Sequence, residues 1–83
     1  MKVKDLLKLL IDGQYVEFNY IDEEGYITGY DVPMYRHNES EGYSPTIYTF
    51  LDRAIVEIYS NVEINGYEVE LDYLAVVLKR EEF

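Results

Sequence analysis

Carboxylates at alternate positions near the end of the chain are the residues best spaced to act together. Glu68, Glu70 and Asp72 lie two apart, and Glu57 and Glu63 precede them on the preceding segment. In a strand, residues two apart project from one face about 7 Å from each other. These side chains therefore predict a regular row of anions, which resembles the charge of a nucleic-acid backbone and would bind a basic surface.

Catalytic chemistry has little support in the sequence. His37 with Glu39 and Glu41 is weak evidence for a metal or acid–base site, because short motifs of this kind arise easily by chance. We expect Arg36 and His37 to lie beside local acids or in solvent. No serine has a base in a suitable setting, and there is no cysteine, glycine-rich phosphate loop or calcium loop. The sequence thus predicts a non-enzymatic protein with no metal and no cofactor.

The acidic row depends on a long β-hairpin over residues 53–79. Asn65-Gly66 between alternating polar and apolar residues is typical of a two-residue hairpin turn. That turn pairs Val62 with Val69 on an apolar face. The acidic face then has the pairs Glu63–Glu68, Asn61–Glu70, Tyr59–Asp72 and Glu57–Leu74. Like charges directly opposite each other weaken a sheet, so folding alone would not select this pattern.

Two features of this hairpin stay open at the level of sequence. Strands this long exceed the usual length of about 5–6 residues, so we expect a bulge or a break near Ser60-Asn61 or Leu71-Asp72. Residues 71–78 also fit a helix, although Val76 and Val77 favour a strand.

The first half of the chain supplies the scaffold. Apolar residues at helical spacing predict a helix over residues 3–12, with Gly13 as its C-terminal cap. Residues 14–21 alternate as a strand, with Val16, Phe18 and Tyr20 on one face. A turn at residues 22–25 leads to a returning strand over 26–32, with a bulge or bend at Gly29 and an end at Pro33.

The middle of the chain predicts a loop over residues 34–43 and then a short helix. Ser44-Pro45 begins that helix, and Asp52-Arg53 closes it. The element order is α-β-β-α-β-β. We therefore predict one α+β domain over residues 1–83, with a mostly antiparallel four-stranded sheet, an N-terminal helix and a short central helix.

The net charge of the chain indicates which kind of partner it can bind. The net charge is −10, from 17 Asp and Glu against 7 Lys and Arg. No Lys or Arg occurs from Leu9 to Tyr35 or from Ala54 to Leu78. The negative field disfavours nucleic acid and anionic membranes and favours basic protein surfaces. The absence of a secretory cleavage site and of a long apolar run predicts a cytoplasmic protein.

Tyrosine is the second unusual component. The chain has 10 tyrosines, more than a core this small can take, and tyrosine is a favoured interface anchor. The expected partner-binding residues are Glu57, Tyr59, Glu63, Tyr67, Glu68, Glu70 and Asp72. A secondary acidic zone comprises Asp22, Glu23, Glu24 and Asp31. The competing interpretation is a solubilising acidic surface with tyrosines selected for strand propensity.

Three stretches carry a family resemblance: VKDLLKLL, YVEFNYIDEEGYI and FLDRAIVEIY. Together they resemble the short, acidic prophage and mobile-element proteins of Gram-positive bacteria, a group that includes anti-CRISPR proteins. The resemblance implies an inhibitor that occupies the basic nucleic-acid-binding surface of a partner such as a Cas effector, in the cytoplasm of the host. The alternative is a phage accessory or structural protein that self-associates, for example as a homodimer, through exposed aromatics or a sheet edge.

Overall fold

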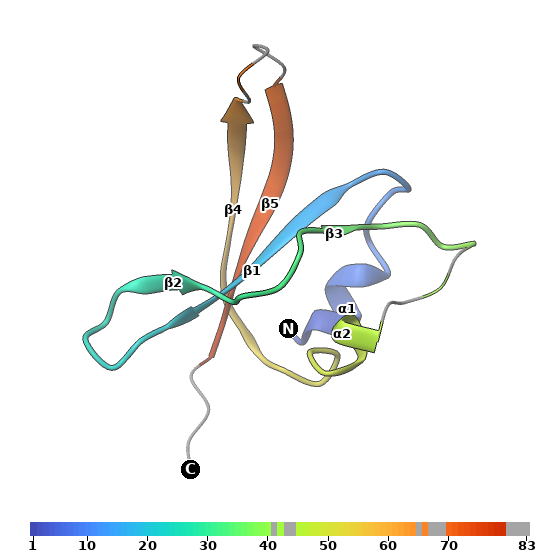
Figure 1. Ribbon diagram of the computed structural model, residues 1–83. Helices are drawn as coiled ribbons and strands as arrows, with labels where there is room; N and C mark the ends of the chain where they lie inside the picture. Colours follow the sequence, from blue (N-terminus) through green and yellow to red (C-terminus); the bar gives the residue numbers. More distant parts are fainter. Residues whose placement is uncertain (41, 43–44, 65, 67–69, 80–83) are drawn as a thin grey trace.

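Two short helices and a five-stranded mixed sheet form the described part of the chain (Figure 1). The computed structural model describes residues 1–40, 42, 45–64, 66 and 70–79. In chain order the elements are α1 (Val3–Leu7), β1 (Tyr15–Ile21), β2 (Ile27–Gly29), β3 (Tyr35–Arg36), α2 (Pro45–Tyr48), β4 (Ile55–Ile64) and β5 (Glu70–Leu78). The predicted α+β class is confirmed, and the sheet has one strand more than expected.

The sheet is mostly antiparallel but contains one parallel pair. Its strand order is β2-β1-β5-β4, and β3 pairs with β1. The parallel pair joins β1 to β5, from Tyr15 opposite Tyr73 to Tyr20 opposite Leu78. Parallel strands are usually buried on both faces, and all four residues from Ala75 to Leu78 are 0% exposed. Residues 71–78 are therefore a central strand, as preferred, and not a helix.

The N-terminal helix is shorter than predicted. α1 ends at Leu7, and the Leu9 and Leu10 N–H groups donate to the carbonyls of Leu6 and Leu7. These tighter bonds turn Leu10 into the core while leaving Leu9 71% exposed. Gly13 is not the cap of this helix. It has a φ of +90° in the turn that leads into β1, where its N–H donates to the His37 carbonyl.

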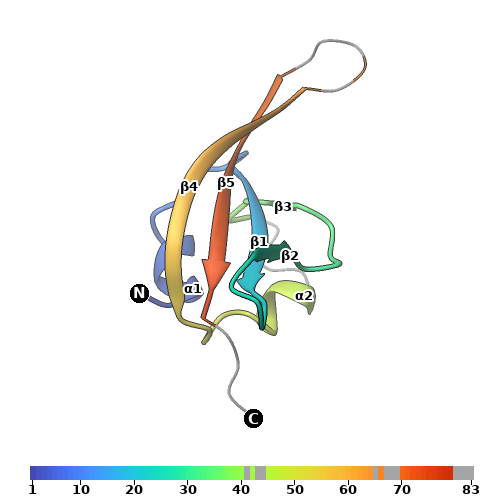
Figure 2. The same cartoon turned by 90° about the vertical axis from the view of Figure 1, so that its left-hand side faces the viewer.

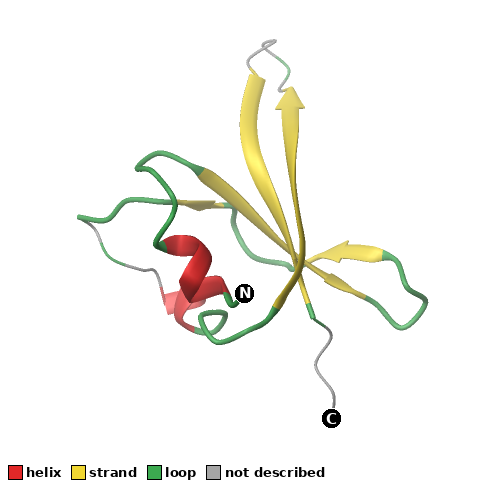
Figure 3. Cartoon of the chain, turned by 180° about the vertical axis from the view of Figure 1, so that it is seen from behind, coloured by secondary structure: helices red, strands yellow, loops and turns green. Residues whose placement is uncertain are grey.

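Helices α1 and α2 cover one face of the sheet (Figures 1 and 3). Val3, Leu6 and Leu7 of α1 join Ile47 of α2 in the core. The sheet contributes Val16, Phe18, Val76 and Leu78 to the same core. Phe18 stacks on Phe50, which follows α2, with ring centroids 4.8 Å apart. We call this the helix side of the sheet and the other the open face.

Part of the predicted loop over residues 34–43 is a strand. Tyr35 and Arg36 form β3, and Tyr35 packs in the core opposite Val16. The returning strand is shorter than predicted and ends at Gly29. The second helix begins at Pro45 as predicted but ends at Tyr48, so the predicted end at Asp52-Arg53 was wrong. The expected N-cap, Ser44, lies outside the described residues.

The β4–β5 hairpin extends beyond the rest of the molecule (Figure 2). Its proximal half carries the buried residues of β5, whereas every residue from Ser60 to Ile64 is exposed. We call residues 60–64 with 70–73 the distal arm. A register shift between Ile55 and Glu57 places the bulge at the base of the hairpin, not at either position predicted from the sequence.

Candidate functional site

The register of the hairpin differs from the prediction by three residues. Ile64 lies opposite Glu70 and Val62 opposite Asp72, whereas a two-residue turn would place Val62 opposite Val69. The predicted register was therefore wrong. A shift by an odd number of residues changes which side chains share a face, because alternate residues of a strand point to opposite faces.

The predicted acidic row is divided as a result. Glu57, Tyr59 and Glu63 pair with Val77, Ala75 and Leu71, so they lie on the open face. Glu70 and Asp72 pair with Ile64 and Val62 and lie on the helix side of the distal arm. Tyr67 and Glu68 fall outside the described residues. The continuous ladder of facing carboxylates is therefore not formed by the described acids.

The parallel pair brings other residues to the open face. Tyr15 of β1 lies beside Tyr73 of β5, and Asn61 of β4 lies on the other side of Tyr73. In the next row, Ala75 has Glu17 on one side and Tyr59 on the other. We define the open-face cluster as Tyr15, Glu17, Tyr59, Glu63 and Tyr73. The sequence did not identify Tyr15, Glu17 and Tyr73 as site residues, because only the β1–β5 pairing brings β1 to the same face as β4.

The pKa of Tyr73 depends on its neighbours in the open-face cluster. Burial raises the pKa of the Tyr73 hydroxyl, and the negative charge of Glu17 raises it further. Tyr59 and Glu63 act in the same direction, and a hydrogen bond with Asn61 opposes them. Carboxylates from β1 and β4 thus act on one tyrosine of β5.

Small, fully buried side chains form the floor of the cluster. Ala75 and Val77 are 0% exposed although no described helix covers this side of the sheet. Asn19 is 3% exposed, and its amide donates to the Val76 carbonyl at 3.5 Å. Gly29 lies opposite Asn19 in the register of β1 and β2. The open face is therefore an apolar floor with partly exposed tyrosines and glutamates around it. Arg36, paired with Tyr15, lies at its margin.

Asp22, the first residue of the secondary acidic zone, has a structural role. One oxygen of the Asp22 carboxylate accepts hydrogen bonds from the Glu24 and Tyr26 N–H groups, both at 2.9 Å. The other accepts from the Thr28 hydroxyl at 3.1 Å. The Tyr26 N–H is the main cause that lowers the pKa of Asp22. Asp22 thus organises the turn between β1 and β2. The other members, Glu23, Glu24 and Asp31, are exposed.

His37 is buried, contrary to the expectation that it would lie beside acids or in solvent. It is 2% exposed, and its Nδ1 lies 2.8 Å from the Tyr35 hydroxyl. Its Nε2 has no hydrogen-bond partner. Within the described residues no group of three or more His, Cys, Asp or Glu side chains could hold a metal ion. Glu41, the third member of the weak motif, lies outside these residues.

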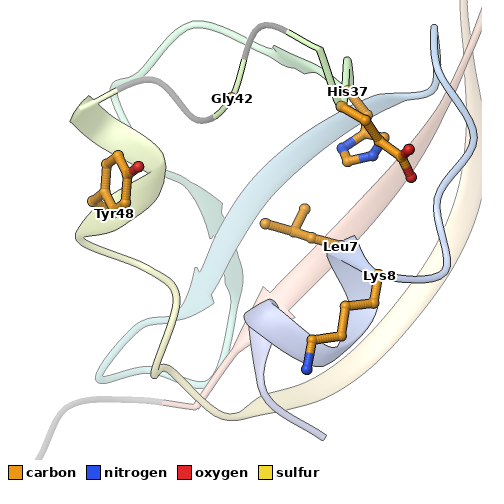
Figure 4. A pocket seen from close by; sticks show the side chains of 6 residues that line it. Leu7, Lys8, His37, Gly42 and Tyr48 are labelled. Carbon is orange, nitrogen blue, oxygen red and sulfur yellow. The ribbon is translucent and has the colours of Figure 1, made fainter.

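A hollow of about 440 Å³ lies beside this histidine on the helix side (Figure 4). The residues that line it are Leu7, Lys8, His37, Glu39, Gly42 and Tyr48. The Glu39 N–H donates to Asp12, so this segment is tied to the turn before β1. Figure 4 shows Lys8 and Tyr48 at opposite sides of the hollow. The lining thus combines one buried imidazole with exposed charges of both signs, Lys8 and Glu39, which specifies no particular ligand.

Comparisons with known proteins add no relatives. No protein-family model matches the chain, and the searches of curated proteins and of solved structures found no match. Across the described residues, no helix has the length and apolarity needed to cross a membrane.

Proposed function

We propose that this protein is an acidic binding module that docks its open sheet face on the basic, nucleic-acid-binding surface of a partner protein. The observation that carries the proposal is the open-face cluster: partly exposed tyrosines and glutamates from three strands, gathered on a face that no described helix covers. The chemistry of that cluster, more than the total charge, supports a binding role.

Tyrosine supplies the contact area. Tyr15, Tyr59 and Tyr73 are each partly buried within the sheet, which limits their rotamers before any partner arrives. A side chain that is already ordered loses less entropy on binding, where immobilising a free one costs about 0.5–1.5 kcal/mol. Amphipathic rings of this kind are enriched at the centres of protein interfaces. The three rings therefore suit the centre of a docking surface.

The glutamates determine that the partner's surface must be positively charged. Glu17, Glu57 and Glu63 lie around the tyrosines, and no Lys or Arg faces the open side from β1, β4 or the described part of β5. Arg36 of β3, paired with Tyr15, is a cation at the margin of this face. A predominantly negative patch steers a positively charged protein and repels nucleic acid and anionic lipid. Association should consequently weaken as salt screens these charges over about 8 Å.

The resemblance to acidic mobile-element proteins suggests the biological setting. An anti-CRISPR-like inhibitor of a Cas effector, acting in the cytoplasm of a Gram-positive host, is the specific form of the proposal. It takes effect without catalysis, by occupying the surface that DNA or RNA would use.

The test is capture from a nuclease-treated Gram-positive lysate with three immobilised forms of the chain. They are the parent, the open-face variant Glu17→Gln/Glu63→Gln, and the control Glu70→Gln/Asp72→Asn. The two variants remove the same charge, but the control changes the helix side of the distal arm. We expect the parent and the control to retain a basic nucleic-acid-binding protein that DNA displaces, and the open-face variant to lose it at least about tenfold, or ~1.4 kcal/mol.

Two results would contradict the proposal. If both variants retained equally little of the partner, binding would depend only on net charge and not on the open face. Retention of a protein that DNA does not displace would show that the partner's nucleic-acid-binding surface is not the target. The alternative function, self-association, predicts a stable dimer of the purified parent by light scattering.

A further inference from the structure

We propose that the outer edge of β4 binds an extended segment of the partner, in which basic and apolar residues alternate, as an additional strand. The inference deepens the proposed function, on which it rests for the sign of the partner's charge. It concerns the edge of the sheet, whereas the proposed function concerns the open face, and the two can fail separately.

The edge of β4 is unpaired over most of its length. β4 spans Ile55–Ile64 and, among the described strands, has β5 as its only neighbour. At its base, Lys2 bridges to Ala54 and the Ile55 N–H donates to the Met1 carbonyl. Beyond Ile55, no described residue pairs with this outer side of β4. Unpaired N–H and C=O groups in a row are a template for strand addition.

The outward groups can be assigned from the alternation of the strand. Backbone groups of alternate residues point to opposite sides, and the Ile55 N–H points outward. The bulge between Ile55 and Glu57 inserts one residue, after which the even-numbered residues point outward. Val62 agrees with this assignment, because its N–H donates to the side-chain Oδ1 of the preceding residue, Asn61, at 2.8 Å and not to a carbonyl of β5. Ile58, Ser60 and Ile64 share its orientation.

The edge has few of the features that usually protect such strands. Native proteins blunt their edges with charged side chains, especially Lys, with Pro or with bulges, and β4 has only the charges of Glu57 and Glu63. The sequence of β4, IVEIYSNVEI, contains no Lys or Pro, and its one bulge lies at the base. The distal part of the strand is therefore long, regular and accessible.

The side chains of β4 specify what the added strand carries. On the open face, Glu57 and Glu63 would lie beside the new strand, so that its residues on this side should be basic. On the helix side of the sheet, Ile58, Val62 and Ile64 are 39%, 46% and 65% exposed. Cross-strand pairs of opposite charge or of apolar residues each contribute roughly 0.2–1 kcal/mol. The pattern selects an extended segment that alternates Lys or Arg with Val or Ile.

A second copy of this chain is a poorer occupant. Two copies would bring together molecules with a net charge of −10 each. An antiparallel pairing of β4 with itself centred on Ser60 would set Glu57 directly opposite Glu63, and like charges in that position are destabilising. Charge complementarity thus favours a basic partner segment over self-pairing.

The experiment uses the full chain and a synthetic peptide, acetyl-Lys-Val-Lys-Val-Lys-Val-Lys-Val-Lys-amide. The control peptide has the same charge but carries proline in place of its two central valines, which prevents strand pairing. We expect the first peptide to bind at least about tenfold more tightly than the second, and to slow amide exchange at Ile58, Ser60 and Ile64. Equal affinity for the two peptides would overturn the proposal.

A variant of the chain provides the reciprocal test. Ser60→Pro removes one outward N–H, and Ser60→Ala keeps it as a matched control. We expect the proline variant alone to lose the preference for the first peptide, with folding checked by circular dichroism. A parent dimer that Ser60→Pro dissociates would show that a second copy occupies the edge, which contradicts the proposal. If the lysate capture succeeds while the peptides bind equally, the proposed function stands and this inference fails.

Discussion

A disulfide across the hairpin tests the register on which the candidate site depends. Val62 and Asp72 are direct partners on the helix side of the distal arm, where strand partners have the Cα separation that a disulfide needs. The chain has no cysteine, so Val62→Cys/Asp72→Cys introduces only the intended pair. We expect it to oxidise readily to an intramolecular disulfide.

The expected gain follows from the loop that the disulfide closes. A loop of about eleven residues removes roughly 3 kcal/mol of chain entropy from the unfolded state. For a domain of this size, 1 kcal/mol shifts Tm by about 4–8 °C. Allowing for strain, oxidation should raise Tm by at least about 10 °C, and reduction should reverse the gain.

The control pair is Val62→Cys/Val69→Cys, which a two-residue turn would place face to face. Mass spectrometry under non-reducing conditions and thermal unfolding with and without reductant are the assays. If the control pair oxidises faster and raises Tm more than Val62→Cys/Asp72→Cys, the register is that of the two-residue turn. The division of the acidic residues between two faces would then be refuted.

Three further predictions concern the core, the first turn and the open face. Phe50→Ala should lower the free energy of unfolding by about 3–5 kcal/mol, measured by urea denaturation, because it removes a buried ring stacked on Phe18; a loss under about 1 kcal/mol would contradict this packing. Folding lowers the pKa of Asp22 from 3.8, so ionised Asp22 stabilises the fold above that pH, and this stabilisation is lost as the pH falls through the folded pKa. Asp22→Asn should therefore flatten the fall in the free energy of unfolding between pH 5 and pH 2. An unchanged dependence of that free energy on pH would argue against the turn contacts. Glu17→Gln should lower the pKa of Tyr73 in an NMR titration, whereas Glu70→Gln should leave it unchanged.

Local patterns in the sequence were sufficient for much of the fold. The alternation of residues 14–21 correctly assigned Val16 and Phe18 to the core, and Gly25, with a φ of +88°, occupies the predicted turn. Pro45 begins α2 as its position indicated. These features depend on neighbours in sequence, which is why periodicity and turn chemistry could predict them.

Long-range pairing could not be predicted in the same way. The parallel contact of β1 with β5 joins segments from opposite ends of the chain, and no local pattern encodes it. Asn65-Gly66 strongly favours a two-residue turn, yet the described strands pair from Ile64 to Glu70. This register lets Val76 and Leu78 face the helices together with Phe18, and burial of these side chains outweighs the preference of the turn. The acidic residues were therefore recognised as a group, but their faces were not.

Labelling of tyrosines in the presence of the captured partner tests the proposed binding surface most directly. Tyr15, Tyr59 and Tyr73 lie on the open face, whereas Tyr26 and Tyr48, which are 68% and 62% exposed, lie outside the open-face cluster and serve as internal controls. Iodination or hydroxyl-radical modification, read out by mass spectrometry, reports each ring separately. The proposed docking predicts strong protection of Tyr59 and Tyr73 with little change at Tyr26 and Tyr48. Protection of Tyr48 with unchanged modification of Tyr59 and Tyr73 would place the partner on the helix side and contradict it.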